Sequence, residues 1–393
     1  MNISVTIAEG GLSARVARVA AIAARHADEV DVDGRFPREA VDAMRAERLL
    51  GIQIPSELGG DGASVTEIAE LCSLLGQACA ASAMVFAMHQ IKLSSLVEHG
   101  ADSGWHRGFM QRIAQHQLLL ASATTEGGIG GNLRNSICAI EVDGTTCRLE
   151  KDATVISYGA HADAILITSR ANPQAASSDQ VLTAFLKDQY TLDKTHAWNT
   201  LGMRGTCSDG FLFKGEALAE QILPKPFVEI AAQSMLATSH LLWSAVWYGI
   251  ATDAVARAQS FVRAAARKAP GVPPPGALRL AEVSSLLQVV KSNIVAGLKV
   301  YEEAKADPDK LSSMAFAVAM NNVKIASSEM ILPIINQTML ICGIVGYKNG
   351  TPYSLGRHLR DAHSAQLMIS NDRILANTST MLLVHKQDTS LLG

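Results

Sequence analysis

The sequence carries little charge for its length. Only 18% of its 393 residues are Asp, Glu, Lys or Arg, the formal charge is −3, and no block of like charge occurs. Because nucleic-acid-binding proteins present a basic patch or stripe, we expect no nucleic-acid partner. The mean hydropathy of +0.16 is typical of a large helical protein that buries long helices or associates with copies of itself.

A clean membrane-spanning segment of about 20 apolar residues is also missing. The segment 235–251 comes nearest, but Thr238, Ser239, His240 and Ser244 interrupt it. This pattern favours a helix buried on most sides rather than a membrane partner. The first residues carry no charged start before an apolar run, which predicts no signal peptide.

The cysteines lack any pairing typical of a metal site. None of the six lies in a CxxC arrangement, and in a chain of this length they are expected to be reduced, mostly buried thiols. They are Cys72, Cys79, Cys138, Cys147, Cys207 and Cys342. We therefore predict no bound metal and a cytoplasmic location.

Hydrophobic periodicity divides the chain into three parts. Residues 1–118 and 223–393 carry apolar residues at three- and four-residue spacing, which indicates helices. Residues 119–222 contain short β-rich runs, with a hairpin signal at Asp143-Gly144. We predict an α+β fold, mainly α, with a helical N-terminal domain, a central β-barrel or sandwich and a C-terminal four-helix bundle. The stiff segment 270–276, PGVPPPG, is expected to join two long helices.

Three motifs could carry chemistry. Residues 123–136, ATTEGGIGGNLRNS, let a backbone approach a ring or a phosphate closely. They do not open a helix after a strand, so they are not the dinucleotide fingerprint, and alone they favour a glycine-rich turn. Ser157 in the segment 155–168 is by itself a local hydrogen-bonding group. Within 341–374, Arg360 and Asp361 are typical of a structural clamp rather than a catalytic pair.

Four segments, in order along the chain, resemble motifs of the acyl-CoA dehydrogenases. They are FPREAVDAMRAERLLGIQIPSELGGDGAS, ATTEGGIGGN, LGMRGTCS, and the glycine turn at Gly343 and Gly346 followed by Arg360-Asp361. The resemblance implies the same three regions and FAD between the β domain and the C-terminal bundle. It also implies a homodimer or homotetramer, an acyl thioester substrate carried by coenzyme A or a carrier protein, and electron-transfer flavoprotein or oxygen as electron acceptor.

The resemblance also implies cofactor-binding residues. Thr124 and Thr125 would lie against the pyrimidine side of the flavin, Gly130 and Gly131 near the pyrophosphate, and Ser157 near flavin N5. At the Gly131 and Asn132 positions the family has serine and aspartate, so backbone N–H groups would have to supply that contact.

Further cofactor contacts are implied at Asn371 and Arg373 in a late helix. Arg267 lies close to the place of a family arginine near the adenine end, although it does not align with it. Val155 replaces the family's flavin-shielding tryptophan and would leave that face of the ring less covered.

The catalytic carboxylate of the family is absent. Its position, nine residues after Arg360, is Ile369, which cannot accept a proton. In some relatives the base comes from an early helix of the C-terminal bundle, where this chain has Ser239 and His240. We predict His240 as a proton-transfer residue; a buried, hydrogen-bonded structural histidine is the equally weighted alternative. His89 and His363 also fall in regions that can face the site.

Three functions stay open. The first is an acyl thioester dehydrogenase with a non-standard base. The second is a flavin-dependent monooxygenase on the same fold, which would not need the glutamate. The third is a non-catalytic acyl-binding subunit. It is the least favoured, because the glycine-rich loop with its two threonines would have little purpose in such a protein.

Overall fold

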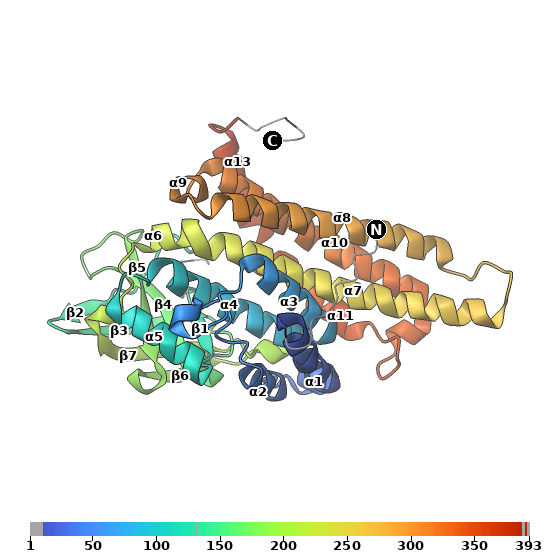
Figure 1. Ribbon diagram of the computed structural model, residues 1–393, viewed down its shortest axis with the longest axis horizontal. Coiled ribbons are helices and arrows are strands. Elements are labelled where there is room, and N and C mark those ends of the chain that lie inside the picture. The colour runs from blue at the N-terminus through green and yellow to red at the C-terminus, as the bar shows by residue number, and fades with distance from the viewer. Residues whose placement is uncertain (1–10, 130–131, 387–389, 391–393) are drawn as a thin grey trace.

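The computed structural model describes residues 11–129, 132–386 and 390, and it begins with a helical domain (Figure 1). The five helices of this domain are α1 (Leu12–Asp33), α2 (Arg38–Ala46), α3 (Val65–Ala78), α4 (Ala80–His99) and α5 (Gly104–His116). Ser64 caps α3 through a capping box with Glu67, which satisfies the free N–H groups of its first turn. Almost every residue of α4 is buried, so this helix lies in the interior and can line an internal site.

The central region consists of two small sheets, as the β-rich pattern predicts. One sheet has the order β1-β4-β5 and the other the order β2-β3-β7-β6. The strands are β1 (Leu120–Ala123), β2 (Glu141–Asp143), β3 (Thr146–Ala153), β4 (Ala164–Arg170), β5 (Gln180–Leu186), β6 (Tyr190–His196) and β7 (Gly210–Leu218). The predicted hairpin is confirmed: β2 pairs with β3 around Gly144, whose φ of 59° favours glycine.

The C-terminal region is helical, as predicted. Three long helices, α7 (Leu236–Lys268), α8 (Ala277–Ala304) and α10 (Met314–Tyr347), form the bundle, and the segment 270–276 joins the first two as expected. The short helices are α6 (Phe227–Ile230), α9 (Pro308–Leu311), α11 (Gly356–Ala362), α12 (Ser364–Leu367) and α13 (Asn371–Leu382), with 3-10 turns at Ser56–Leu58, Gly159–His161, Lys187–Gln189, Arg204–Thr206 and Ala219–Gln221. A π-helical turn, Ala231–Met235, leads directly into α7.

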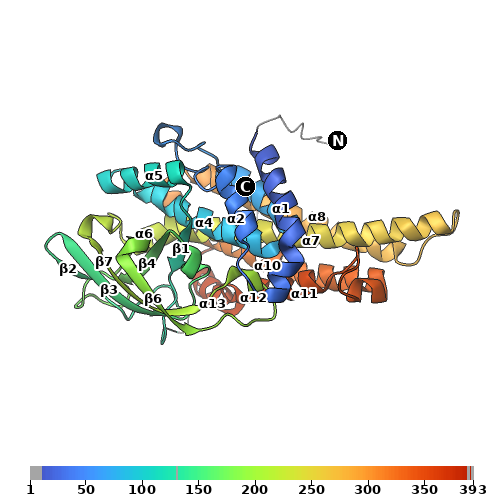
Figure 2. The ribbon, with the colours of Figure 1, turned by 90° about the horizontal axis from the view of Figure 1, so that it is seen from below.

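Helix α7 connects the layers. It packs on α3 and α4 on one side and on α8 and α10 on the other, while the sheets lie at one end of the molecule and the α7–α8 turn extends at the other (Figure 1, Figure 2). Gly76 of α3 and Gly249 of α7 allow the two backbones to touch, since a Cβ on Gly249 would lie 2.3 Å from the Ser73 carbonyl oxygen. This close crossing fixes the N-terminal domain against the bundle.

Helix α10 is, within the described ranges, the one helix whose length and apolar composition would allow it to cross a membrane. Core helices of soluble proteins pass the same test, and α10 packs against α7 and α8. The segment 235–251, which the sequence predicts to be buried, lies in the π turn and α7, and most of its residues are buried. All six cysteines are free thiols, four of them buried, as expected.

Candidate functional site

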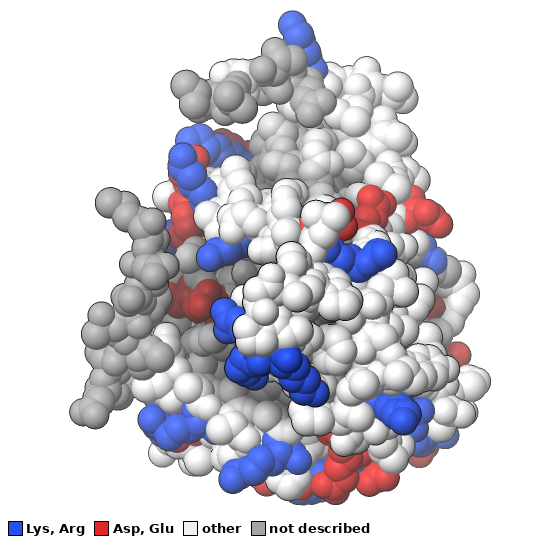
Figure 3. All heavy atoms as spheres, turned by 90° about the vertical axis from the view of Figure 1, so that its right-hand side faces the viewer, with Lys and Arg blue, Asp and Glu red and all other residues white. Residues whose placement is uncertain are grey.

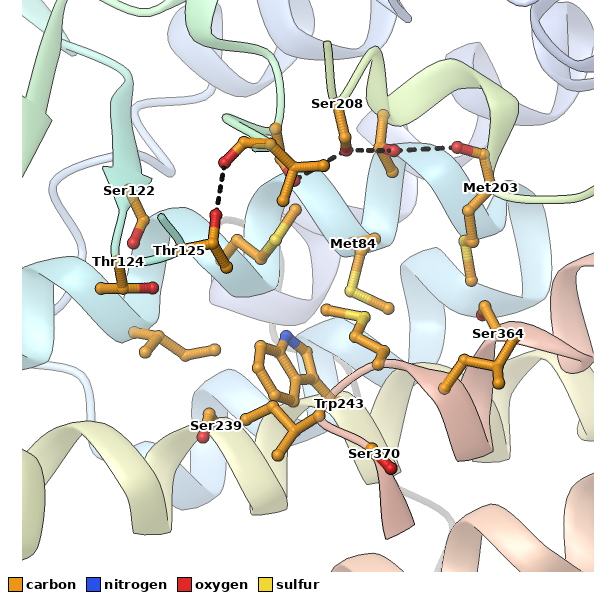
Figure 4. Close-up of a pocket in the computed structure, with 18 of the residues that line it drawn as sticks. Met84, Ser122, Thr124, Thr125, Met203, Ser208, Ser239, Trp243, Ser364 and Ser370 are labelled. Atoms are coloured by element: carbon orange, nitrogen blue, oxygen red, sulfur yellow. Dashed lines mark hydrogen bonds between the residues drawn. The ribbon is translucent and has the colours of Figure 1, made fainter. Parts of the chain in front are cut away.

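A cavity of about 670 Å³ lies where the N-terminal domain, the central sheets and the bundle meet (Figure 4). Its walls come from β1 and the loop after it, the segment 155–158, the segment 198–208, the facing sides of α4 and α7, and the chain from α11 to α13. The lining residues used below are Met84, Met88, Ile91, Lys92, Ser122, Thr124, Thr125, Val155, Ser157, Met203, Thr206, Ser208, Met235, Leu236, Ser239, Trp243, Arg360, His363, Ile369 and Arg373.

A chain of hydroxyl groups follows one wall. Thr206 Oγ1 donates to the Met203 carbonyl (2.8 Å) and lies 2.9 Å from Ser208 Oγ, which lies 2.8 Å from Ser157 Oγ. Because each hydroxyl has one hydrogen, Ser208 must donate to Thr206, and Ser157 must donate to Ser208. The lone pairs of Ser157 are therefore left as acceptors toward the cavity. Figure 4 shows the hydrogen bonds of this row from Ser208 to Met203.

The threonines after β1 stand on the same side of the cavity. Thr125 Oγ1 donates to the Val155 carbonyl (3.0 Å), which ties the end of β1 to the Ser157 segment. In the described part of the chain, the hydroxyls of Ser122 and Thr124 bond to no other protein group, so both can donate to a bound molecule. This wall thus offers two free donors and one oriented acceptor.

The glycine-rich loop is held by its own carboxylate. Glu126 is buried and accepts hydrogen bonds from the backbone N–H groups of Ile137 (3.0 Å) and Cys138 (2.6 Å) and from the Ser136 hydroxyl (2.8 Å). Burial acts to raise the pKa of Glu126, but these donors and the Lys151 ammonium outweigh it and lower the pKa. The carboxylate is thus a structural anchor that joins residue 126 to residues 136–138.

The opposite wall consists of two facing rows on α4 and α7. Met84, Met88, Ile91 and Lys92 follow one face of α4 at helical spacing. The facing row begins with Met235 at the end of the π turn and continues with Leu236, Ser239 and Trp243 of α7. Trp243 projects its indole between the two rows (Figure 4), and its buried Nε1–H has no partner in the described part of the chain. A buried donor without an acceptor costs free energy, so a ligand acceptor would stabilise this arrangement.

The segment 200–208 is fastened by the Arg360-Asp361 pair. Asp361 Oδ1 accepts the backbone N–H of Met203 at 2.7 Å, and Arg360 forms an ion pair with Asp31 of α1. The pair therefore clamps two elements, in agreement with the role predicted from the sequence. Asp361 lies near the end of α11, which begins at Gly356.

Ile369, at the position of the missing carboxylate, lies in the cavity wall with a left-handed backbone. Its φ is 50°, which is costly for a β-branched residue. The Lys324 ammonium donates to the Ile369 carbonyl at 2.7 Å and to Asn371 Oδ1 at 2.5 Å. These bonds hold the turn and place the Ile369 side chain where it faces the site.

The predicted cofactor-binding residues fall into two groups. Thr124, Thr125, Ser157 and Arg373 line the cavity together. Asn371 does not: it is buried beside it as the partner of Lys324 and Ser328. Gly130 and Gly131 lie outside the described residues.

Arg267 lies far from the cavity of its own chain. It is exposed in the last turn of α7, 24 residues beyond Trp243, which is about 36 Å along a helix. Figure 3 faces this end of the molecule, where Lys and Arg side chains are spread over the surface around the α7–α8 turn. Arg267 is therefore not part of this cavity.

His240 is not a lining residue. It is 2% exposed, and its Nε2–H donates to Asn321 Oδ1 at 3.2 Å, while Asn321 donates to Thr378 of α13. Burial, followed by the charge of Lys324, lowers the pKa of His240 to about 4, although the bond to Asn321 acts against this. The structural alternative stated for His240 fits this geometry, since the residue ties α7 to α10 and, through Asn321, to α13.

The two other histidines also differ in place. His89 is buried, accepts the Leu120 N–H (3.0 Å) and donates to the Leu50 carbonyl (2.6 Å), so it positions β1. His363 lines the cavity from the junction of α11 and α12 and is solvent-exposed. No Asp or Glu side chain lines the cavity within the described ranges, and no cluster there could hold a metal.

Sequence reasoning missed Lys92 and Trp243. Trp243 and Trp247 lie four residues apart and would share one helix face, so core packing explains both from the sequence; Trp247 is indeed fully buried. The available signal was a lysine on an otherwise apolar face of the helix 80–99, at positions i, i+4, i+7 and i+8 with Met84, Met88 and Ile91. A charge on that face has to be compensated or to face a cavity.

Comparison with known proteins finds acyl-CoA dehydrogenases that are similar to this chain in sequence. Residues 12–116 match the family model of the acyl-CoA dehydrogenase N-terminal domain. The chain is similar to cyclohex-1-ene-1-carbonyl-CoA dehydrogenase of Geobacter metallireducens, at 25% identity over 58% of this chain and 60% of that protein. It is also similar to the probable acyl-CoA dehydrogenase FadE25 of Mycobacterium tuberculosis, at 19% identity over 89% of this chain and 88% of that one.

Among solved structures, the chain is similar to the dibenzothiophene monooxygenase TdsC of Paenibacillus sp. A11-2 in its FMN-bound form. The TM-score is 0.83 at 19% identity, over 96% of this chain and 98% of TdsC. The match to the cyclohexene-carbonyl-CoA dehydrogenases of Geobacter metallireducens and Syntrophus aciditrophicus spans 60% and 58% of those proteins.

Proposed function

We propose that this chain is a flavin-dependent oxidoreductase that removes hydrogen from a CH–CH bond of an acyl thioester, because it is similar in sequence to acyl-CoA dehydrogenases and in fold to a flavin-bound protein. The observation that supports this most is the convergence of Thr124, Thr125, Ser157 and Arg373 on one cavity. These residues were predicted as flavin contacts from segments far apart in the sequence.

The residues present fit a flavin. The ring needs donors and acceptors along one edge and apolar or aromatic surface elsewhere, and the cavity supplies free hydroxyls on Ser122 and Thr124 opposite the α4–α7 wall. The unpartnered Trp243 Nε1–H adds a buried donor. A bound flavin would supply hydride acceptance. The acceptor lone pairs of Ser157 would suit an N–H of the reduced ring, and Thr124 would suit a carbonyl oxygen.

We propose FAD as the flavin, with its adenine end reaching a neighbouring copy of the chain. Arg267 supports this, because the resemblance puts a family arginine near the adenine end close to this position. Arg267 is exposed and lies about 36 Å along α7 from the cavity of its own chain, so it would contact a cofactor bound in a neighbouring copy. Apolar side chains exposed on α8 and α10 support a homodimer or homotetramer; they include Val289, Val295, Leu340, Ile344 and Tyr347. The free cysteines are consistent with a reducing, cytoplasmic location.

Flavin binding tests the site directly. The apoprotein should bind FAD, measured by quenching of flavin fluorescence, more tightly than FMN. Thr124→Val, which removes the hydroxyl that would donate to a flavin carbonyl oxygen, should weaken binding by about tenfold, the value of one hydrogen bond. Ser379→Ala, on the exposed face of α13, is the control and should bind like the wild type. Equal FAD and FMN affinity would count against the adenine-end proposal, and no binding of either flavin would count against the function.

A second candidate is oxygen chemistry on the same site. It is favoured by the absence of Asp and Glu from the described cavity lining, because activation of oxygen by a flavin does not need a carboxylate base to remove an α-proton. Electron-transfer flavoprotein and oxygen therefore both remain as proposed electron acceptors. Rapid mixing of the reduced protein with oxygen would separate the two: a transient, substrate-dependent flavin–oxygen adduct supports the second candidate, and slow direct reoxidation supports the first.

A further inference from the structure

Lys92 is a buried cation that faces the cavity without an oxygen partner. Its side chain is 4% exposed, and its ammonium group contacts only the Met235 sulfur, at 2.9 Å, in the described part of the chain. A thioether is a weak acceptor, so this contact leaves most of the hydrogen-bonding capacity of the ammonium unused.

The two other buried lysines show what a structural lysine looks like in this protein. Lys151 donates to the Thr168 carbonyl at 2.7 Å and lies 3.8 Å from the Glu126 carboxylate. Lys324 donates to the Ile369 carbonyl and to Asn371. Both satisfy their charge with protein oxygens, as buried charges normally do. The exception among the three is Lys92, which is also the only one of them that lines the cavity.

The surroundings of Lys92 explain why the protein itself does not supply the missing acceptor. Met84, Met88 and Ile91 share its face of α4, and Met235 and Leu236 face it from α7. Met235 ends the π-helical turn Ala231–Met235, a distortion that is frequent at functional sites. Burial lowers the pKa of Lys92 to about 7, and a nearby anion would restore its charged form.

The two helices set the geometry of this end of the cavity. Contacts of Lys92 with Met235 and of His99 with Ser234 show that the carboxyl half of α4 meets the start of α7. Lys92 lies eight residues from Met84, and Met235 lies eight from Trp243, which is about 12 Å along either helix. The Met84–Trp243 end and the Lys92–Met235 end therefore bound a wall long enough for an extended acyl chain of medium length.

We propose that Lys92 is a specificity-determining residue that binds a carboxylate carried on the acyl chain of the substrate, so that the preferred substrate class is the mono-thioester of a dicarboxylic acid. That the substrate is a thioester rests on the proposed function. The anion site itself follows from the unpartnered ammonium in the cavity wall.

Paired probes of equal length test the assignment. Binding of the mono-coenzyme A thioesters of adipic and suberic acid should be compared with that of hexanoyl- and octanoyl-coenzyme A by calorimetry, on the flavin-loaded protein without oxygen. The wild type should bind at least one dicarboxylic probe about 10- to 100-fold more tightly than its monocarboxylic partner, the range for a hydrogen bond to a charged group.

Three variants make the test specific. Lys92→Met keeps the length and removes the charge, so the preference should disappear or reverse. Lys92→Arg keeps the charge and should retain part of the preference for the dicarboxylic probes. Lys310→Met, an exposed lysine on α9, should leave it unchanged. An equal affinity for both probe types in the wild type, or an undiminished preference in Lys92→Met, would overturn the proposal.

Free adipate separates this proposal from the proposed function. If no thioester binds the wild type, the proposed function fails, and the anion site is then judged by thermal denaturation with adipate. Adipate should raise the melting temperature of the wild type more than that of Lys92→Met. Equal shifts would overturn the anion site as well.

Discussion

Two side chains of the cavity wall, Ile369 and Lys92, sit in environments that their chemistry does not favour. Ile369 adopts φ of 50°, and Lys92 carries a buried ammonium with only a sulfur contact. Backbone strain and unpaired buried charge persist where the surrounding structure over-determines them, and they are frequent at functional sites. Both features therefore indicate that this cavity is a functional site, and they are stronger evidence for it than the volume of the cavity.

Ile369→Glu should restore a proton acceptor to the wall. Glutamate is not β-branched and tolerates the left-handed turn better than isoleucine. If the flavin-loaded protein dehydrogenates acyl thioesters, the rate of anaerobic flavin reduction should rise by about 10²-fold, a typical value for a positioned general base. Ile369→Gln matches the size without the charge, and an equal rate in the two variants would show that this position does not reach the reacting carbon.

Lys92→Met should make the ligand-free protein more stable. Burial lowers the folded-state pKa of Lys92 to about 7 from an ordinary value of 10.5, so the destabilisation is complete below pH 7 and fades as the pH rises toward 10.5. At pH 7 the variant should gain about 1–4 kcal/mol in the free energy of unfolding, as when buried charges are replaced by apolar groups. Denaturant unfolding at pH 7 and pH 10 measures this; a gain that does not shrink at pH 10 contradicts the account.

At the scale of elements, the cavity depends on how closely the helices approach one another. Helix α7 touches α3 through Gly249 and Gly76 and faces α4 across the site. The hydroxyl wall depends on Asp361, which fastens Met203. Movement of α7 by the width of one methyl group would therefore displace Trp243 and Met235 together.

Gly249→Ala tests this packing. Its new Cβ would lie 2.3 Å from the Ser73 carbonyl oxygen and 2.9 Å from Gly76 Cα, both backbone atoms that cannot rotate away. We expect a loss of about 1–3 kcal/mol in the free energy of unfolding, as for overpacked cores. Gly108→Ala in α5, where no atom lies within 4 Å of the new Cβ, should instead stabilise by about 0.5–1 kcal/mol. Similar values for the two variants would refute the close crossing.

The molecule as a whole should be sensitive to acid. Burial lowers the pKa values of His89, His106 and His240 to about 4. The unfolded chain binds a proton at each of these histidines below about pH 6.5 that the folded protein does not bind until about pH 4. The contribution of these histidines to the free energy of unfolding is therefore fully present above pH 6.5. As the pH drops toward 4 the free energy of unfolding falls by about 1.4 kcal/mol per pH unit for each histidine.

His240→Gln removes one of these titrations while keeping an amide that can donate to Asn321. The free energy of unfolding of this variant should fall less steeply than that of the wild type between pH 6.5 and pH 4, measured by urea unfolding at several pH values. An unchanged slope would show that folding does not lower the pKa of His240.

The overall architecture was predictable from the sequence because periodicity and turn residues act locally. The helical periods before residue 118 and after 223, the Asp143-Gly144 hairpin and the loop at 270–276 all appear in the structure. The family resemblance predicted Thr124, Thr125 and Ser157 as neighbours in one site, and the three line one cavity. His240 lies on α7, which contributes other residues to the cavity wall, but helical spacing alone does not tell which face of a helix points at a cavity. Lys92 was missed because its significance depends on having no partner, which only the three-dimensional arrangement reveals.

An anaerobic visible spectrum of the flavin-loaded protein, titrated with acyl-coenzyme A thioesters, tests the central claim most directly. Oxidised flavin absorbs near about 450 nm, and the account predicts that this band bleaches on addition of an acyl thioester. A band that persists with every thioester, together with rapid, substrate-dependent reaction of the reduced protein with oxygen, would contradict dehydrogenation and favour the oxygenase.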